Sequence, residues 1–143
     1  MKRSVVIGLL VILAACSPRI KKTTVSYYDS VEVYNSGGFT STSTGYVIQK
    51  NGEIYLLYHF PNKPYQQKFY RQANTDSVNM VFSRIKESGV EMQQYDRPGN
   101  LTYAIKLQKD SSVHELRWAD GQDSAKTYME LYRYLRAFAS GKN

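Results

Sequence analysis

The 143-residue chain contains one cysteine, two histidines and no apolar run long enough for a membrane-spanning helix. A single cysteine can neither close an intrachain disulfide nor build a cysteine-rich zinc site. The longest apolar run, residues 5–15, is shorter than the ~20 residues that a spanning helix requires. From residue 29 onward, 14 Lys and Arg residues stand against 12 Asp and Glu residues. The two charges nearly balance, and this part of the sequence has no basic stripe of the kind that a nucleic-acid-binding domain carries. No nucleic-acid partner is therefore expected.

Hydrophobic residues make up 42% of the chain, and 13 tyrosines contribute to an aromatic fraction of 13%. Disordered chains have few aromatic residues and low hydrophobicity, so this composition predicts a folded protein. The length suits one domain with a core of its own.

The N-terminal segment has the pattern of a secretory signal. Lys2 and Arg3 precede the apolar run, whose length suits the h-region of such a signal. The following Leu13-Ala14-Ala15-Cys16 closely resembles the lipobox of bacterial lipoproteins. This resemblance implies diacylglyceryl transfer to the thiol of Cys16, cleavage just before it and acylation of the new amine. The alternative is an ordinary secretory signal in which the cysteine occurs by chance.

The lipobox resemblance divides the chain into a signal peptide at 1–15, a lipidated cysteine with a short basic tether at 16–28, and one domain at 29–143. Two or three acyl chains would anchor the protein permanently to a membrane. By resemblance to Gram-negative lipoproteins, Ser17 is compatible with sorting to the outer membrane. A thioether at Cys16 would also remove that sulfur from disulfide, metal and catalytic chemistry.

Residues 45–50 and 53–60 are rich in β-forming residues and flank Asn51-Gly52. Asn-Gly between such runs is the strongest short hairpin signal, because both turn positions need positive φ. A two-residue turn there pairs Ile48 with Tyr55. Apolar residues on both faces predict a central place in a sheet for this hairpin.

A second hairpin is predicted at residues 101–108 and 112–118, with Asp110-Ser111 in the turn. This register pairs Lys106 with Glu115 and separates an apolar face from a polar one. A slip of one residue would mix the two faces, so the pattern itself favours the register.

Two amphipathic helices are predicted at residues 75–88 and 123–139, from apolar residues spaced by three and four. The apolar stripe of the first is Val78, Val81, Phe82 and Ile85. The stripe of the second is Ala125, Tyr128, Met129, Tyr132, Leu135 and Ala139.

An edge strand is predicted at residues 30–34, and residues 66–71 and 90–94 are weaker strand candidates. The chain order of strands, helix, strands, helix then predicts an α+β fold. Its antiparallel sheet is built from the two hairpins plus the edge strand, and packs against the two helices.

Few residues have the spacing that chemistry requires. His59 and His114 lie in no metal-ligand motif, so we expect no metal and no cofactor. His114 is either a structural histidine or a ligand, and His59 borders a proline-containing connection that is either a rigid link or a binding loop. Asp120 and Asp123 form either a helix cap or a carboxylate pair. Without a nucleophile and a base in a recognised arrangement, no enzymatic activity is expected.

The segment Asn35-Ser36-Gly37-Gly38-Phe39 is unusual because two glycines precede an aromatic residue. It is either a hairpin turn whose phenylalanine folds back on the core, or a presented loop with an aromatic anchor for a partner. Gly37, Gly38 and Phe39 are therefore the candidate partner-binding residues.

Five features follow one another over residues 30–138. They are a strand ending in Ser-Gly-Gly-Phe, a middle helix, a strand like 101–107, the segment His114-Glu115-Leu116-Arg117-Trp118, and a final helix. This order resembles the emfourin family, small protein inhibitors of thermolysin-like metallopeptidases. The resemblance implies that the segment around Gly37, Gly38 and Phe39 contributes to blocking a peptidase.

Two functions follow from these patterns. The first is a lipid-anchored lipoprotein of the bacterial envelope, held at the membrane through Cys16, that presents a small non-catalytic binding or structural domain to an envelope protein. The alternative is a membrane-tethered, emfourin-like inhibitor whose partner is a metallopeptidase.

Overall fold

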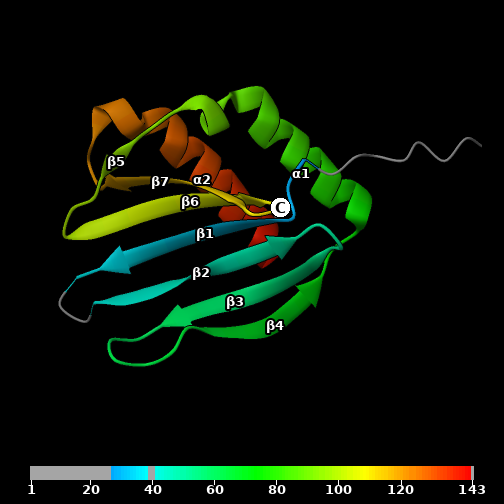
Figure 1. The fold of residues 1–143 in the computed structure, drawn as a ribbon, viewed down its shortest axis with the longest axis horizontal. Helices are drawn as coiled ribbons and strands as arrows, with labels where there is room; N and C mark the ends of the chain where they lie inside the picture. Colours follow the sequence, from blue (N-terminus) through cyan, green and yellow to red (C-terminus); the bar gives the residue numbers. More distant parts are fainter. Residues whose placement is uncertain (1–26, 39–40, 143) are drawn as a thin grey trace, which may run out of the picture.

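The computed structural model describes residues 27–38 and 41–142, so the lipobox with Cys16, most of the tether, and Phe39 lie outside the described residues. The described part is an α+β domain with one seven-stranded sheet and two helices (Figure 1). The helices are α1 (Thr75–Ser88) and α2 (Lys126–Ser140). The strands are β1 (Ser30–Gly37), β2 (Thr42–Gln49), β3 (Glu53–His59), β4 (Gln66–Gln72), β5 (Asp96–Arg97), β6 (Leu101–Lys109) and β7 (Ser112–Ala119).

The strand order is β4-β3-β2-β1-β6-β7-β5. All neighbouring strands are antiparallel except β5 and β7, which are parallel. Both helices pack against the same face of the sheet, because alternate strand residues join both helices in one hydrophobic core. Its fully buried members include Val31, Val33, Ile48, Ile54, Phe82, Ile105, Leu116 and Leu135.

Helix α1 confirms the prediction in its limits and in its buried residues. The side chain of Asn74 caps its start by accepting a hydrogen bond of 2.8 Å from the Asp76 backbone N–H. Gly89 ends it in the left-handed conformation, with φ of 68°.

Helix α2 differs from its prediction at the start and on its buried face. A 3-10 turn, Asp123–Ala125, precedes it, and the helix begins at Lys126 without a side-chain cap hydrogen bond. The capping interpretation of Asp120 and Asp123 is therefore wrong. Its buried residues include Leu131 and Phe138, which the predicted stripe left out.

The second hairpin has the predicted register, with Lys106 opposite Glu115. The first hairpin is one residue out, because Ile48 pairs with Ile54 rather than with Tyr55. The Gly52 N–H bonds the Gln49 carbonyl at 3.0 Å, and Gly52 has a φ of 91°. This is the longer turn with a glycine bulge, which places both isoleucines on the helix side.

The prediction that residues 30–34 form an edge strand is wrong, because β1 is the central strand of the seven. The sheet is thus larger than two hairpins and an edge strand. Residues 66–71 do form a strand, which is the edge strand β4, whereas Val90–Met92 is a 3-10 turn. The first hairpin is internal to the sheet, as predicted.

Candidate functional site

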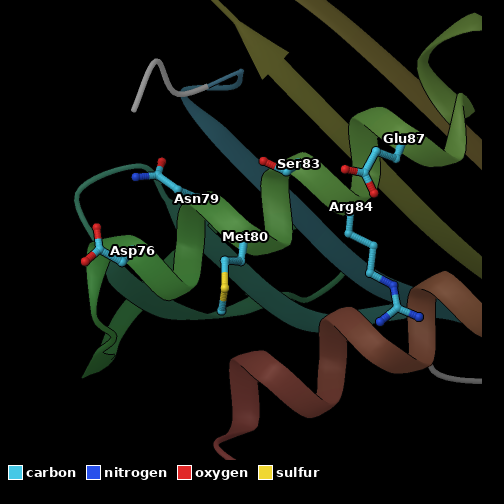
Figure 2. A pocket seen from close by; sticks show the side chains of 6 residues that line it. All are labelled: Asp76, Asn79, Met80, Ser83, Arg84 and Glu87. Carbon is cyan, nitrogen blue, oxygen red and sulfur yellow. The ribbon is translucent and has the colours of Figure 1, made fainter. Parts of the chain in front are cut away.

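A cavity of about 670 Å³ lies against the exposed side of α1 (Figure 2). Its lining side chains are Asp76, Asn79, Met80, Ser83, Arg84 and Glu87, which all belong to this one helix. A ligand site normally needs polar groups that converge from several elements, so this surface lacks the features of one.

The face of the sheet turned away from the helices, here called the open face, has a more organised set of side chains. Three of the described residues are both buried and polar or charged, and all three lie on this face by strand alternation: Ser30, Glu32 and Thr102. An outward sheet face is ordinarily solvated. Here the large side chains of the same face cover its centre.

Glu32, on the central strand, is the middle of this arrangement. Its side chain is only 9% exposed and accepts hydrogen bonds from Lys106 Nζ at 3.1 Å and from the Tyr65 hydroxyl at 3.3 Å. Burial and the nearby charge of Glu32 raise the pKa of Tyr65. Tyr65 comes from the β3–β4 connection, so this hydrogen bond ties that connection to the central strand β1. The ammonium of Lys106 compensates the charge of the buried carboxylate.

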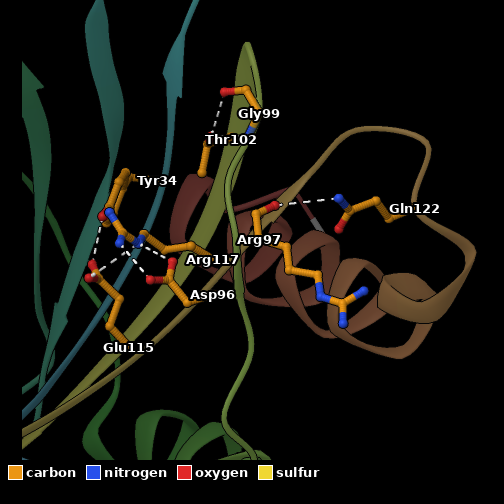
Figure 3. A network of polar contacts seen from close by, with 8 residues as sticks. All are labelled: Tyr34, Asp96, Arg97, Gly99, Thr102, Glu115, Arg117 and Gln122. Atoms are coloured by element: carbon orange, nitrogen blue, oxygen red, sulfur yellow. Dashed lines mark hydrogen bonds and ion pairs between the residues drawn. The ribbon is translucent and has the colours of Figure 1, made fainter.

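A second polar group continues the open face toward β7 and β5 (Figure 3). The Tyr34 hydroxyl donates a hydrogen bond of 2.6 Å to Glu115, and burial is the main cause that raises the pKa of Tyr34. Arg117 binds Asp96 through both Nε and Nη2, at 2.8 and 2.9 Å. The same guanidinium lies 3.9 Å from Glu115, so one network links three strands.

Aromatic side chains form the other margin of the open face. The ring of His59 lies 5.7 Å from that of Tyr65, and the ring of Tyr55 lies 5.9 Å from that of Phe69. Tyr65 and Phe69 remain 48% and 53% exposed. Exposed tyrosine and phenylalanine side chains are enriched in protein interfaces.

The structure gives the paired glycines a packing role. A Cβ on Gly37 would lie 1.9 Å from the carbonyl oxygen of Asn100, and its φ is 111°. The Gly38 N–H donates a hydrogen bond of 2.7 Å to that same oxygen. Glycine at position 37 is therefore required by the close approach of two turns, which favours the hairpin-turn interpretation for this residue.

The two histidines are not brought together. His59 lies at the end of β3 on the open face, whereas His114 is half-buried on the helix side. The Nε2 atom of His114 lies 3.1 Å from the Val90 carbonyl oxygen, as suits a structural histidine. Within residues 27–38 and 41–142, no group of three or more potential metal ligands is present. The helices of that same part of the chain are too short or too polar to span a membrane.

Sequence reasoning missed Glu32, Tyr34 and Tyr65 as members of the site. Lys106 and Glu115 were already predicted to pair in the second hairpin. The missing signal was the pairing of β1 with β6, which brings Glu32 and Lys106 together across 74 positions of sequence.

Comparisons with protein-family models and with curated proteins find no match to this sequence.

Proposed function

We propose that the protein is a lipid-anchored lipoprotein of the bacterial envelope whose domain is a non-catalytic binding module. The lipobox-like sequence ending at Cys16 supports the anchor. The open face supports the binding role and is the surface that we assign to the partner, an envelope protein.

The observation that carries the binding role is the arrangement around Glu32. Its carboxylate, Lys106 and the Tyr65 hydroxyl are engaged with one another rather than aimed at the place of a reacting group. Such a network presents a rigid, preorganised surface, and the exposed rings of Tyr65 and Phe69 supply apolar contact area beside it.

A photo-cross-linking residue in place of Phe69 tests this surface. The full-length chain carrying benzoylphenylalanine at position 69 is illuminated in its native envelope, and adducts are identified by mass spectrometry. We expect one discrete adduct with an envelope protein. Met80, exposed on α1, is the matched control position and should yield no such adduct. An adduct from position 80 alone, or equally from both positions, contradicts the assignment of the open face.

The second candidate function is a membrane-tethered, emfourin-like inhibitor of thermolysin-like metallopeptidases. It rests on the emfourin-like order of the sequence. The hydrogen bond from Gly38 to Asn100 joins the β1–β2 and β5–β6 connections into one tip, which is where the inhibitory segment would lie. That tip lies a full strand, about 27 Å, from the start of β1. Stoichiometric inhibition of a thermolysin-like enzyme by the full-length chain, weakened by Phe39→Ala without loss of fold, would favour this function over the first.

A further inference from the structure

A second cavity lies on the helix side of the sheet, where the end of α2 passes over β2. It has a volume of about 280 Å³ and is lined by Tyr46, Arg136, Ala137, Ser140 and Lys142. Drug-sized ligands occupy pockets of roughly 300–1,000 Å³, so this one suits a single side chain or a small ion. We call it the α2 pocket.

Arg136 is held in place within the α2 pocket. Its Nη1 donates hydrogen bonds of 3.0 Å to Asn35 and 3.0 Å to the Tyr132 hydroxyl. The guanidinium also lies 5.8 Å from the ring centre of Tyr46 and 5.7 Å from that of Tyr132. Both hydrogen bonds leave from one nitrogen. The Nε and Nη2 donors therefore keep the fork geometry with which arginine binds a carboxylate.

The end of the helix does not account for the cations in this pocket. A cationic side chain near a helix C-terminus can donate hydrogen bonds to the last backbone carbonyls of the helix. In α2 these carbonyls already accept hydrogen bonds from other groups. Arg71 donates from Nε to the Ala139 carbonyl at 3.0 Å and from Nη2 to that of Phe138. The Lys142 backbone N–H serves the Ala137 carbonyl at 3.1 Å. The side-chain charges of Arg136 and Lys142 are thus not needed to complete α2.

The α2 pocket is lined by two cations and by no acidic side chain of the described residues. All 12 acidic residues of the domain lie elsewhere. Glu32, Glu53, Asp96 and Glu115 lie on the open face; Asp76 and Glu87 on α1; Asp29, Glu91 and Asp110 near the start of β1; and Asp120, Asp123 and Glu130 at the start of α2. The pocket is therefore electrostatically complementary to an anion.

We propose that the α2 pocket binds a carboxylate from an acidic peptide segment of a protein partner. The planar fork of Arg136 takes the two oxygens, Lys142 adds a second positive charge, and Tyr46 forms an amphipathic wall. Tyr46 is itself in contact with Tyr70 of β4, at 5.7 Å between ring centres, so the wall continues toward the free edge of the sheet. This site is on the opposite side of the sheet from the open face and depends on neither the lipid anchor nor the open-face assignment.

The test uses the full-length chain in a neutral detergent and a fluorescein-labelled hexaglutamate peptide as the probe, with a hexaglutamine peptide as its uncharged match. Fluorescence anisotropy at low salt should show binding of hexaglutamate only, and added salt should weaken it. Arg136→Gln should weaken it at least about tenfold, because a charge-assisted, bidentate contact is lost.

Arg133→Gln is the matched control, since Arg133 is an exposed arginine on the same helix that lies outside the α2 pocket. We expect it to change the affinity less than about twofold, on the order of what a rim charge contributes. Lys142→Gln is a second pocket variant, and it should also weaken binding. Because Lys142 is exposed, this substitution should not disturb the fold. Equal weakening by Arg133→Gln and Arg136→Gln, or unchanged binding in both pocket variants, would overturn the proposal. Binding of inorganic phosphate that depends on Arg136, without binding of hexaglutamate, would overturn it as well.

Discussion

At the residue scale, tyrosine hydroxyls on the open face donate to carboxylates, among them those of Tyr34 and Tyr65. Tyr34 donates to Glu115 and Tyr65 donates to Glu32. Burial is the main reason that the pKa of each phenol is raised, and the adjacent negative charges add to it. Each of these tyrosines is therefore held in its neutral, hydrogen-bond-donating form by the fold.

This predicts a loss of stability in alkaline solution. An unfolded tyrosine loses its proton near pH 10, whereas the folded protein retains the protons of Tyr34 and Tyr65 above that pH. Their contribution to stability is complete below about pH 10 and is lost progressively as the pH rises beyond it, because the unfolded state then binds fewer protons. Urea unfolding between pH 8 and 11 should show the decline. The double variant Tyr34→Phe/Tyr65→Phe should make the decline less steep, since the pKa values of Tyr28 and Tyr132 are also raised by burial and their contributions remain. An identical slope in the variant would contradict this account.

At the element scale, Arg71 joins the edge strand β4 to the end of α2. Its guanidinium serves the carbonyls of Ala139 and Phe138 and lies 5.5 Å from the ring centre of Phe138. These contacts link two elements whose sequence positions differ by nearly 70 residues. The last turn of α2, which forms the α2 pocket, is thereby fixed to the sheet.

Replacing Arg71 by glutamine should loosen that last turn. We expect faster amide hydrogen exchange at residues 138–142 and a fall of about 1–3 kcal/mol in the free energy of unfolding, since two hydrogen bonds from a charged donor are lost. Lys68→Gln, on the same strand, is the matched change in charge and should leave exchange in α2 unaltered. Exchange that is unchanged in the Arg71→Gln variant would mean that the helix end is held by other contacts.

At the scale of the whole molecule, the start of β1 is the end of the domain nearest to the proposed anchor. A tether of about 12 residues reaches at most ~40 Å. This reach limits how far the start of β1 can lie from the membrane, and the open face extends from there along the sheet toward the Gly37 turn, by about one strand length.

The anchor itself predicts the behaviour of a single variant. Cys16→Ser removes the acceptor sulfur for the lipid, so nearly all of the protein should move from the membrane fraction to the soluble envelope fraction. Fractionation of the bacterial envelope, followed by immunoblotting against the domain, measures this shift. Cys16→Ser protein that stays with the membrane would contradict the lipobox interpretation without affecting either surface proposal.

Local patterns predicted a large part of the fold. Helix α1 follows from apolar residues at helical spacing and from Gly89, and the second hairpin follows from the separation of its apolar and polar faces. The predicted register of the first hairpin was wrong by one residue, because the turn residues Asn51-Gly52 are compatible with two loop lengths. The choice between those loops was made by the burial of Ile48 and Ile54 together.

Residue spacing and turn chemistry act over a few residues, so they were enough to place α1 and the strands of both hairpins. Three other features came from long-range packing: β1 is central, Glu32 is buried beside Lys106, and Arg136 meets Asn35 from 101 positions away. These outcomes depend on which distant segments bury the most surface when they pair, and no local pattern in the chain encodes that comparison.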